Sequence, residues 1–205
     1  MFLTAMTTET TTTPIDDFLR DLDRQEVSGA TVRNYRSDLE HFARWFREST
    51  GEPFAPAAVT PTDIRDYKSH LVSVQHRAPA TVNRRLAALG SFFRWAKGQR
   101  LVSELPTEGV KSVAATPRAP HALAKREVDR LLRVAERAGK KRDLAVVLTL
   151  RHTGLRVGEL CALTRDDLEL GERKGQVTVR SGKGNKYRVV PLNVDARRAL
   201  QAYLE

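Results

Sequence analysis

One stretch constrains the fold of this chain more than any other: residues 150–163, L-R-H-T-G-L-R-V-G-E-L-C-A-L. The Thr153-Gly154 pair breaks an apolar helical run, and a second, short helix begins directly after it. Arg156 and Glu159 are three residues apart, so their side chains are neighbours on one side of this helix. A rigid guanidinium fork beside a carboxylate is suited to a phosphate, although an exposed structural ion pair is the other interpretation. The opposite side is apolar and is expected to be buried; it carries Val157, Leu160, Cys161 and Leu163.

A β-hairpin is predicted after this short helix. Residues 176–180 alternate as a strand, residues 181–185 (S-G-K-G-N) form a turn, and residues 187–192 (Y-R-V-V-P-L) return as a second strand. The turn places Lys183 at the tip of the hairpin. A final helix over residues 194–204 follows the hairpin.

The first half of the chain has the pattern of a helical domain. Thr13-Pro14 and Thr60-Pro61 are each followed by an acidic residue, which is the pattern of a helix start. Apolar residues spaced by three and four predict four amphipathic helices in residues 14–104, joined by short loops. Their polar faces are rich in arginine and are either solvated or bind a partner. The helices are predicted over residues 14–27, 31–47, 61–74 and 80–97.

The remaining segments separate or extend these regions. Residues 105–121 contain three prolines and show no periodicity, which indicates an interdomain linker. Two further amphipathic or apolar helices are predicted over residues 123–138 and 141–151. Residues 1–13 are rich in threonine and are expected to be a disordered tail, with Met6 as an alternative start.

The charge of the chain is strongly positive and unevenly distributed. Its 205 residues carry a formal net charge of +10, with a pI near 10.2. Residues 1–100 hold 14 Lys and Arg against 12 Asp and Glu, and residues 101–205 hold 21 against 13. A polyanionic partner, DNA or RNA, is therefore expected mainly on the second half. The alternative is a basic protein whose charged side chains are merely solvated.

Composition excludes several protein classes. The single cysteine, Cys161, rules out a disulfide within the chain and a cysteine-based zinc site, and it is expected to pack as a small apolar residue. No run approaches the ~18 apolar residues needed to span a bilayer. Residues 1–13 lack the basic and apolar segments of a secretory signal. A cytoplasmic protein without a membrane partner is therefore expected.

Three motifs, in their order and spacing, resemble a known family. T-G-L-R-x-x-E-L at residues 153–160 is followed by L-T-x-x-D at 163–167 and by G-K-G-N-K-x-R-x-V-P-L at 182–192. This arrangement is similar to the catalytic domain of tyrosine recombinases (phage integrases, Xer-like). The sequence T-V-N-R-R-L-A-A-L-G-S-F-F-R-W-A at 81–96 is likewise similar to the last helix of that family's N-terminal, SAM-like core-binding domain.

The resemblance implies a fold that is mainly α-helical with a small antiparallel β-hairpin or sheet. A SAM-like four-helix core-binding domain would occupy residues 14–104, and a linker over 105–121 would let two domains close around DNA. Residues 122–205 would form the N-terminal half of an α+β catalytic domain. The implied partners are double-stranded DNA and other recombinase protomers, which form a tetramer on DNA in the family. The implied reaction is DNA integration or site-specific recombination through a 3′-phosphotyrosyl bond, without metal, ATP or another cofactor.

The same resemblance assigns roles to individual residues. Arg156 matches the first catalytic arginine, which stabilises the charged phosphorane. Lys183 matches the hairpin lysine, which is the expected general acid for the leaving 5′-hydroxyl. Glu159 matches an acid near the active site and would orient other groups rather than react. The residues expected to contact DNA are Arg33, Arg84, Arg85, Lys186 and Arg188.

The rest of the family's catalytic set is not expected in these residues. Residues 41–44 (H-F-A-R) fit the family's His-x-x-Arg string, but Phe42 is expected in a helical core, so we interpret the match as chance. Neither Tyr187, on the return strand, nor Tyr203, in the helix directly after the hairpin, is expected to be the nucleophile. His152 is expected to be packed or hydrogen-bonded. We therefore predict that this chain binds DNA without cutting it, as a fragment of a longer recombinase or as a naturally short product.

Two alternatives remain beside the recombinase interpretation. One is a catalytically inactive DNA-binding module that occupies recombination sites or regulates a full-length recombinase. The other is an RNA-binding or helical scaffold protein, which fits the charge but not the spacing from Arg156 to Lys183. The sequence does not identify the DNA target.

Overall fold

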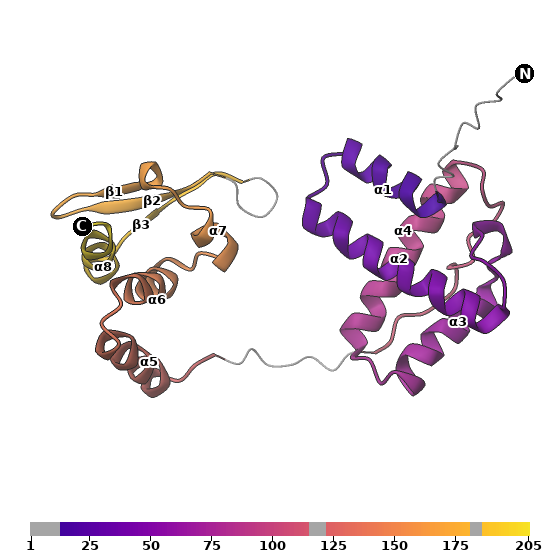
Figure 1. Ribbon diagram of the computed structural model, residues 1–205, viewed down its shortest axis with the longest axis horizontal. Coiled ribbons are helices and arrows are strands. Elements are labelled where there is room, and N and C mark those ends of the chain that lie inside the picture. Colours follow the sequence, from indigo (N-terminus) through magenta and orange to yellow (C-terminus); the bar gives the residue numbers. More distant parts are fainter. Residues whose placement is uncertain (1–12, 115–121, 181–185) are drawn as a thin grey trace, which may run out of the picture. The chain divides into compact units, whose positions relative to one another are not determined.

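The computed structural model describes residues 13–114, 122–180 and 186–205. Contacts within the chain divide it into two compact units, Met1–Arg118 and Ala119–Glu205, and each is described by itself (Figure 1). The tail predicted over residues 1–13 lies outside the described residues except for Thr13. The last part of the predicted linker and the whole predicted hairpin turn lie outside them too.

The described part of the first unit is helical. Its elements are α1 (Pro14–Arg24), α2 (Gly29–Thr50), the 3₁₀ turn η1 (Pro56–Ala58), α3 (Pro61–Ser69), the π-helical turn η2 (His70–Val74) and α4 (Pro79–Gly98). The predicted helix starts at Thr13 and Thr60 are confirmed, because each threonine accepts the backbone N–H three residues on. The helix predicted to begin at residue 31 begins two residues earlier, with Ser28 as its cap.

Aromatic side chains fill the core of the first unit between α1, α2, α3 and α4. Phe42, Tyr67, Phe92 and Phe93 are all fully buried. Phe18 of α1 lies edge-on to Phe92 of α4, with ring centroids 5.6 Å apart. Such pairs stabilise beyond the area that they bury, by about 0.5–1.5 kcal/mol each. The position expected for Phe42 in the core is therefore confirmed.

The chain after α4 stays on the first unit for longer than the sequence indicated. Asn83 of α4 donates to the carbonyl of Val113 at 2.9 Å and accepts from its N–H at 2.7 Å. Lys68 donates to the carbonyl of Lys111 at 2.7 Å. The side chains of Leu105 and Val113 are packed against the core. The packed part of this unit therefore extends beyond residue 104.

The second unit combines helices with a three-stranded antiparallel sheet. Its elements are α5 (Lys125–Arg137), α6 (Lys141–Thr153), α7 (Val157–Cys161), the 3₁₀ turn η3 (Arg165–Asp167), β1 (Leu168–Leu170), β2 (Gly175–Val179), β3 (Arg188–Pro191) and α8 (Val194–Leu204). The strand order is β1-β2-β3, with Leu168 paired to Val177 and Val179 paired to Arg188. The predicted hairpin strands and the final helix are confirmed, and β1 is a strand that the sequence reasoning did not predict.

Helices α6 and α8 pack together beneath the sheet and form the second core (Figure 1). Its buried members come from α6, the α6–α7 turn, the sheet and α8: Ala145, Leu155, Val177, Val179, Leu192, Ala196, Ala199 and Leu200. None of the residues of α5 is fully buried. In the described ranges, no helix has both the length and the apolar content needed to cross a membrane.

The apolar face predicted for the short helix α7 is largely wrong. Val157 is 66% exposed and Cys161 is exposed, while Leu160 and Leu163 are only half-buried. The buried side chain of this helix is instead Glu159. A helix of five residues turns only a narrow face inward, and here a carboxylate with several hydrogen-bond partners occupies it.

Candidate nucleic-acid interface

The turn between α6 and α7 aims one arginine at the surface. Gly154 ends α6 with φ of +64°, a left-handed conformation that glycine adopts without the penalty of a Cβ atom. Leu155 follows as a buried anchor. Arg156 is then the residue that caps the start of α7. The T-G-L-R sequence therefore fixes the backbone before Arg156, and the first turn of α7 fixes it after Arg156.

Glu159 is the centre of the cluster around Arg156. Its side chain is 5% exposed and accepts four hydrogen bonds. Its Oε2 accepts the backbone N–H of Arg156 at 2.8 Å, and its Oε1 accepts Nη1 of Arg156 at 2.9 Å. Arg188 of β3 adds a bidentate pair, Nη1 to Oε1 at 3.0 Å and Nη2 to Oε2 at 2.6 Å. This carboxylate thus links α7 to the sheet.

These bonds determine the charge of Glu159. The guanidinium of Arg188, followed by the backbone N–H of Arg156, lowers the pKa of Glu159 to about 2 from its ordinary value of 4.5, against the effect of burial. The same contact raises the pKa of Arg188. Glu159 is therefore ionised at neutral pH, which suits a group that orients arginines rather than one that exchanges protons.

The two arginines keep donors available for an anion. The Arg156 side chain is 61% exposed, and among the described residues its guanidinium donates only to Glu159. Arg188 is 35% exposed. One carboxylate facing two guanidinium groups leaves a net positive charge at the surface. A phosphate, which accepts paired hydrogen bonds from a planar fork, is the anion that matches this arrangement.

The other residues singled out in this unit lie in different settings. Lys183 falls among residues 181–185, outside the described residues, whereas Lys186 is exposed. Tyr187 and Tyr203 are 66% and 45% exposed. His152, in the last turn of α6, is exposed, so the expectation that it packs is wrong, and the described residues give it no hydrogen-bond partner.

In the first unit, two adjacent arginines of α4 meet a buried carboxylate of α2. Asp38 is 3% exposed; its Oδ2 accepts Nη1 of Arg84 at 2.5 Å, and its Oδ1 lies 3.7 Å from Nε of Arg85. Arg84 is 49% exposed, but Arg85 is only 12% exposed. Arg33 is exposed on α2. Arg85 therefore does not face solvent, because polar groups hold its side chain inward, and its contact with DNA stays a prediction.

One of those groups is His41. Its Nε2 accepts Nη1 of Arg85 at 2.9 Å, so the neutral ring carries its proton on Nδ1, which lies 2.9 Å from the hydroxyl of Tyr67. Burial, followed by the charge of Arg85, lowers the pKa of His41 to about 4. Burial also raises the pKa of Tyr67 to about 12. Nothing in the sequence identified Asp38 as a partner of these arginines, except that it is an acidic residue on a helix with many apolar residues.

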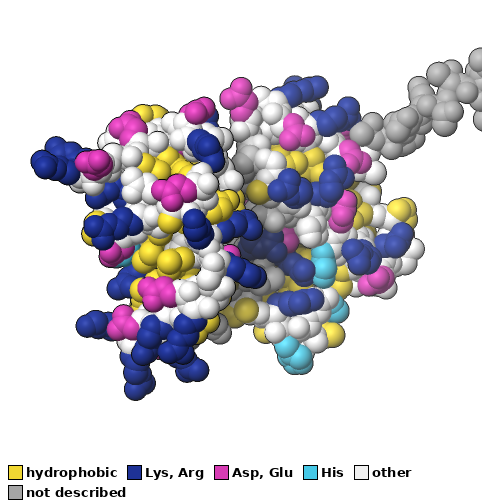
Figure 2. Space-filling model, turned by 60° about the vertical axis from the view of Figure 1, so that its left-hand side comes forward, with side chains coloured by type: hydrophobic (Ala, Val, Ile, Leu, Met, Phe, Trp, Pro, Cys, Tyr) yellow, Lys and Arg dark blue, Asp and Glu magenta, His cyan; other side chains and the backbone are white. Residues whose placement is uncertain are grey.

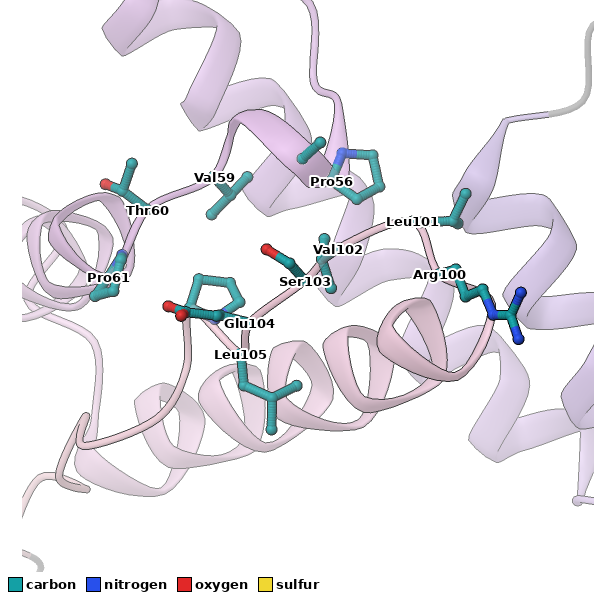
Figure 3. Close-up of a pocket in the computed structure, with 12 residues that line it drawn as sticks. Pro56, Val59, Thr60, Pro61, Arg100, Leu101, Val102, Ser103, Glu104 and Leu105 are labelled. Atoms are coloured by element: carbon teal, nitrogen blue, oxygen red, sulfur yellow. The ribbon is translucent and has the colours of Figure 1, made fainter.

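The first unit also has a hollow of about 300 Å³ beside η1 and the chain that follows α4 (Figure 3). Its walls are mainly proline, valine, leucine and backbone, and Glu104 contributes a negative charge. Figure 3 shows the side chain of Arg100 pointing away from the hollow. This hollow contains none of the predicted site residues and does not offer an anion a cationic wall.

Basic side chains are spread over most of the surface drawn in Figure 2, with acidic side chains between them. Within the described ranges, no three His, Cys, Asp or Glu side chains are grouped so that they could hold a metal ion. The geometry therefore offers partly exposed guanidinium groups held by buried carboxylates, an arrangement whose remaining donors suit an anion.

Two family models match the chain. Residues 15–100 match the model for "Phage integrase, N-terminal SAM-like domain", and residues 121–205 match the model for "Phage integrase family". The tyrosine recombinase XerC of Roseiflexus castenholzii is 35% identical over 197 residues, which are 93% of this chain and 60% of that protein. The tyrosine recombinase XerD of Bifidobacterium longum is 35% identical over 183 residues, 87% of this chain and 58% of that protein. The chain thus spans about 60% of the length of these curated relatives.

Solved structures share the fold at lower sequence identity. A lambda integrase (residues 75–356 of that protein) in a dimer bound to a COC′ core site superposes with a TM-score of 0.71 and 19% identity, covering 92% of this chain and 67% of that one. The Tn1549 transposon integrase in complex with a circular intermediate DNA gives a TM-score of 0.66 and 17% identity, covering 94% and 65%.

Proposed function

This chain belongs to the phage integrase family of tyrosine recombinases, and from that premise we propose that it supplies the DNA-binding portion and part of the catalytic centre of a site-specific recombinase. The single observation that carries the proposal is the pair Arg156 and Arg188 held on the buried, ionised Glu159. A charged fork kept in one orientation is what a scissile phosphate requires as negative charge builds up on its oxygens.

We assign roles to three residues of this centre. Arg156 stabilises the pentacoordinate phosphate, and Lys183 donates a proton to the 5′-hydroxyl that leaves. Glu159 keeps Arg156 and Arg188 in place. In the complete reaction a tyrosine attacks the phosphate and forms a 3′-phosphotyrosyl bond, whose energy is kept for rejoining. Lys186, exposed beside the start of β3, contacts the DNA backbone.

The first unit binds the duplex as a core-binding domain over residues 14–104, with residues 105–121 as the connection to the catalytic part. Arg33 and Arg84 are exposed enough to reach phosphates. Arg85 supports Arg84 from within the domain, because His41 and Asp38 hold its side chain there and Asp38 also binds Arg84. The lambda and Tn1549 integrases were solved bound to DNA, which supports duplex DNA as the partner. Binding by a dimer, as in the lambda complex, supports other protomers as further partners.

We further propose that these 205 residues by themselves do not cleave DNA. The only His-x-x-Arg string in them is at residues 41–44, and His41 there is engaged by Arg85 and Tyr67 within the first unit. No residue of the chain is assigned as the nucleophile. A nicked suicide duplex should accordingly yield no covalent adduct, and an adduct on denaturing gels would contradict the assignment.

A titration on duplex DNA and duplex RNA at several salt concentrations tests the binding. We expect preference for DNA, and an observed binding constant that falls with salt with a slope of several released counterions. Arg156→Lys retains the charge but loses the fork, so its affinity should fall while the slope stays. Equal, weak binding to both duplexes would contradict the proposal.

The alternative is a module that occupies recombination sites without reacting. The spacing of the motifs from Arg156 to Lys183 favours it over an RNA-binding scaffold. One experiment distinguishes the two proposals: the part of a related recombinase that this chain does not cover is added as a separate polypeptide. Recovered cleavage that requires Arg156 supports the enzyme; protection of the site from a full-length relative, with no recovered cleavage, supports the module.

A further inference from the structure

A second buried carboxylate in the second unit repeats the arrangement at Glu159. Asp167, the last residue of η3, is 4% exposed. Its Oδ2 accepts the backbone N–H of Thr164 at 2.8 Å and the hydroxyl of Thr164 at 3.0 Å. Nη2 of Arg180 donates to the same Oδ2 at 2.8 Å and to the Thr164 hydroxyl at 3.1 Å. Neither Asp167 nor Arg180 is among the site residues expected from the sequence.

The two clusters share one construction. In each, a carboxylate accepts the backbone N–H of the residue three positions earlier and also binds a guanidinium from the sheet. Arg188 is the first residue of β3, and Arg180 directly follows β2. Since Val179 is paired with Arg188, both arginines lie at the same end of the β2–β3 ladder.

Arg180 is held at one edge and open at the other. Its side chain is 59% exposed, and among the described residues only its Nη2 is hydrogen-bonded. The Thr164 backbone N–H, more than any other group, lowers the pKa of Asp167 against the effect of burial, so the carboxylate is ionised. A guanidinium with one nitrogen fixed presents its remaining donors in a defined plane, the geometry that recognises a phosphate.

We propose that Arg180 binds a backbone phosphate of duplex DNA and that Asp167 is the positioning residue that orients it. This inference rests on the proposed function, because it adds a phosphate contact beside the Glu159 cluster. A purely structural ion pair would need only the contact between the two side chains. It would not require the outward edge of Arg180 to remain open.

The test measures duplex-DNA affinity against salt for the whole 205-residue chain. Arg180→Ala should weaken binding by about tenfold and reduce the magnitude of the salt slope by about one. Arg180→Lys should keep the slope and lose part of the affinity. Asp167→Asn should also weaken binding while keeping the slope, since the charge of Arg180 remains. In the Arg180→Ala background, Asp167→Asn should add no further loss of affinity.

The control is Arg198→Ala, which removes an exposed arginine of α8 in the same unit and should leave affinity and slope unchanged. Circular-dichroism melts establish that each variant is folded; if Asp167→Asn is not, Asp167→Glu takes its place and should retain most of the affinity. Wild-type affinity and slope in Arg180→Ala would overturn this inference alone. Failure of the wild-type chain to prefer DNA would overturn the proposed function and this inference with it.

Discussion

Each unit of the chain buries one carboxylate between two arginines, yet the pKa values of the two carboxylates shift in opposite directions. Glu159 in the second unit accepts four hydrogen bonds, and its pKa falls to about 2. Asp38 in the first unit accepts one hydrogen bond at 2.5 Å, and its second arginine remains at 3.7 Å. The pKa of Asp38 is raised, because the effect of burial exceeds that of the two guanidinium groups.

In this pair, well-formed hydrogen bonds, rather than the number of nearby cations, set the direction in which the pKa of the buried carboxylate shifts. Within the described structure, Oδ1 of Asp38 and Nε of Arg85 are buried and make no hydrogen bond. Glu159 has a backbone N–H and a bidentate fork, and both of its oxygens are satisfied. The Glu159 cluster is therefore built to stay charged, whereas the Asp38 cluster retains unused hydrogen-bonding capacity.

The largest effect should come from Glu159→Gln. The substitution removes the bidentate acceptor of Arg188 and leaves two guanidinium groups facing each other. We expect the second unit to melt several degrees lower and the DNA affinity to fall by more than about tenfold, since Arg156 loses its orientation. Circular-dichroism melts and DNA titrations measure these effects. Glu169→Gln, an exposed glutamate of β1, is the matched control and should change neither quantity.

The next largest effect is on stability, which should depend on pH differently in the two units. The folded-state pKa of His41 lies at about 4, below its ordinary value of 6.5, so the unfolded chain binds the proton first as pH falls. The first unit should therefore lose stability between pH 6.5 and 4. Glu159 has a depressed pKa, so its contribution to the second unit is lost between pH 4.5 and 2.

The two transitions can be followed separately. Both tryptophans, Trp45 and Trp95, lie in the first unit, so their fluorescence during urea unfolding reports on that unit. His41→Gln should remove the fluorescence-detected loss of stability between pH 6.5 and 4. The loss that Glu159 causes in the second unit below pH 4.5, followed by circular dichroism, should stay. An unchanged pH profile in this variant would mean that another group causes the loss.

A smaller effect is expected from Asp38→Asn. Burial already disfavours the charged form of Asp38. Replacing this carboxylate by a neutral amide should therefore remove less stabilisation than the same replacement of Glu159. The fluorescence-detected midpoint of the first unit should shift by less than the midpoint of the second unit shifts in Glu159→Gln. A larger shift in Asp38→Asn would reverse the comparison between the two clusters.

The smallest effect should come from Cys161→Ser. Cys161 is exposed on α7, so removing its sulfur costs little, within about 0.5 kcal/mol. The wild-type thiol should also react with a maleimide in the native protein as fast as in urea. Protection of the thiol in the native state would show that α7 buries the face that the sequence had indicated.

Much of the local structure could be predicted from short-range patterns. Thr13 and Thr60 with their following prolines located two helix starts, and Thr153-Gly154 located the end of α6. The alternation of residues 176–180 and 187–192 located two strands. At the helix ends the determining interaction joins residues within four positions of each other. In the strands the partners are farther apart, as in the pair of Val179 and Arg188, but the alternation of apolar and polar side chains is visible within each short segment.

The sequence by itself determined most of the helices, the two hairpin strands, the excess of positive charge, and the motifs that contain Arg156, Glu159 and Arg188. Only the tertiary structure decided that Glu159 is buried and Val157 exposed, that Arg85 turns inward, and that Arg180 meets Asp167. The contacts behind these outcomes join residues that are far apart in the sequence: Asp167 and Arg180 are 13 residues apart, Glu159 and Arg188 are 29 apart, and His41 and Arg85 are 44 apart. Their physical cause is the competition between burying an apolar side chain and satisfying a buried charge, which is settled only when separate elements pack together.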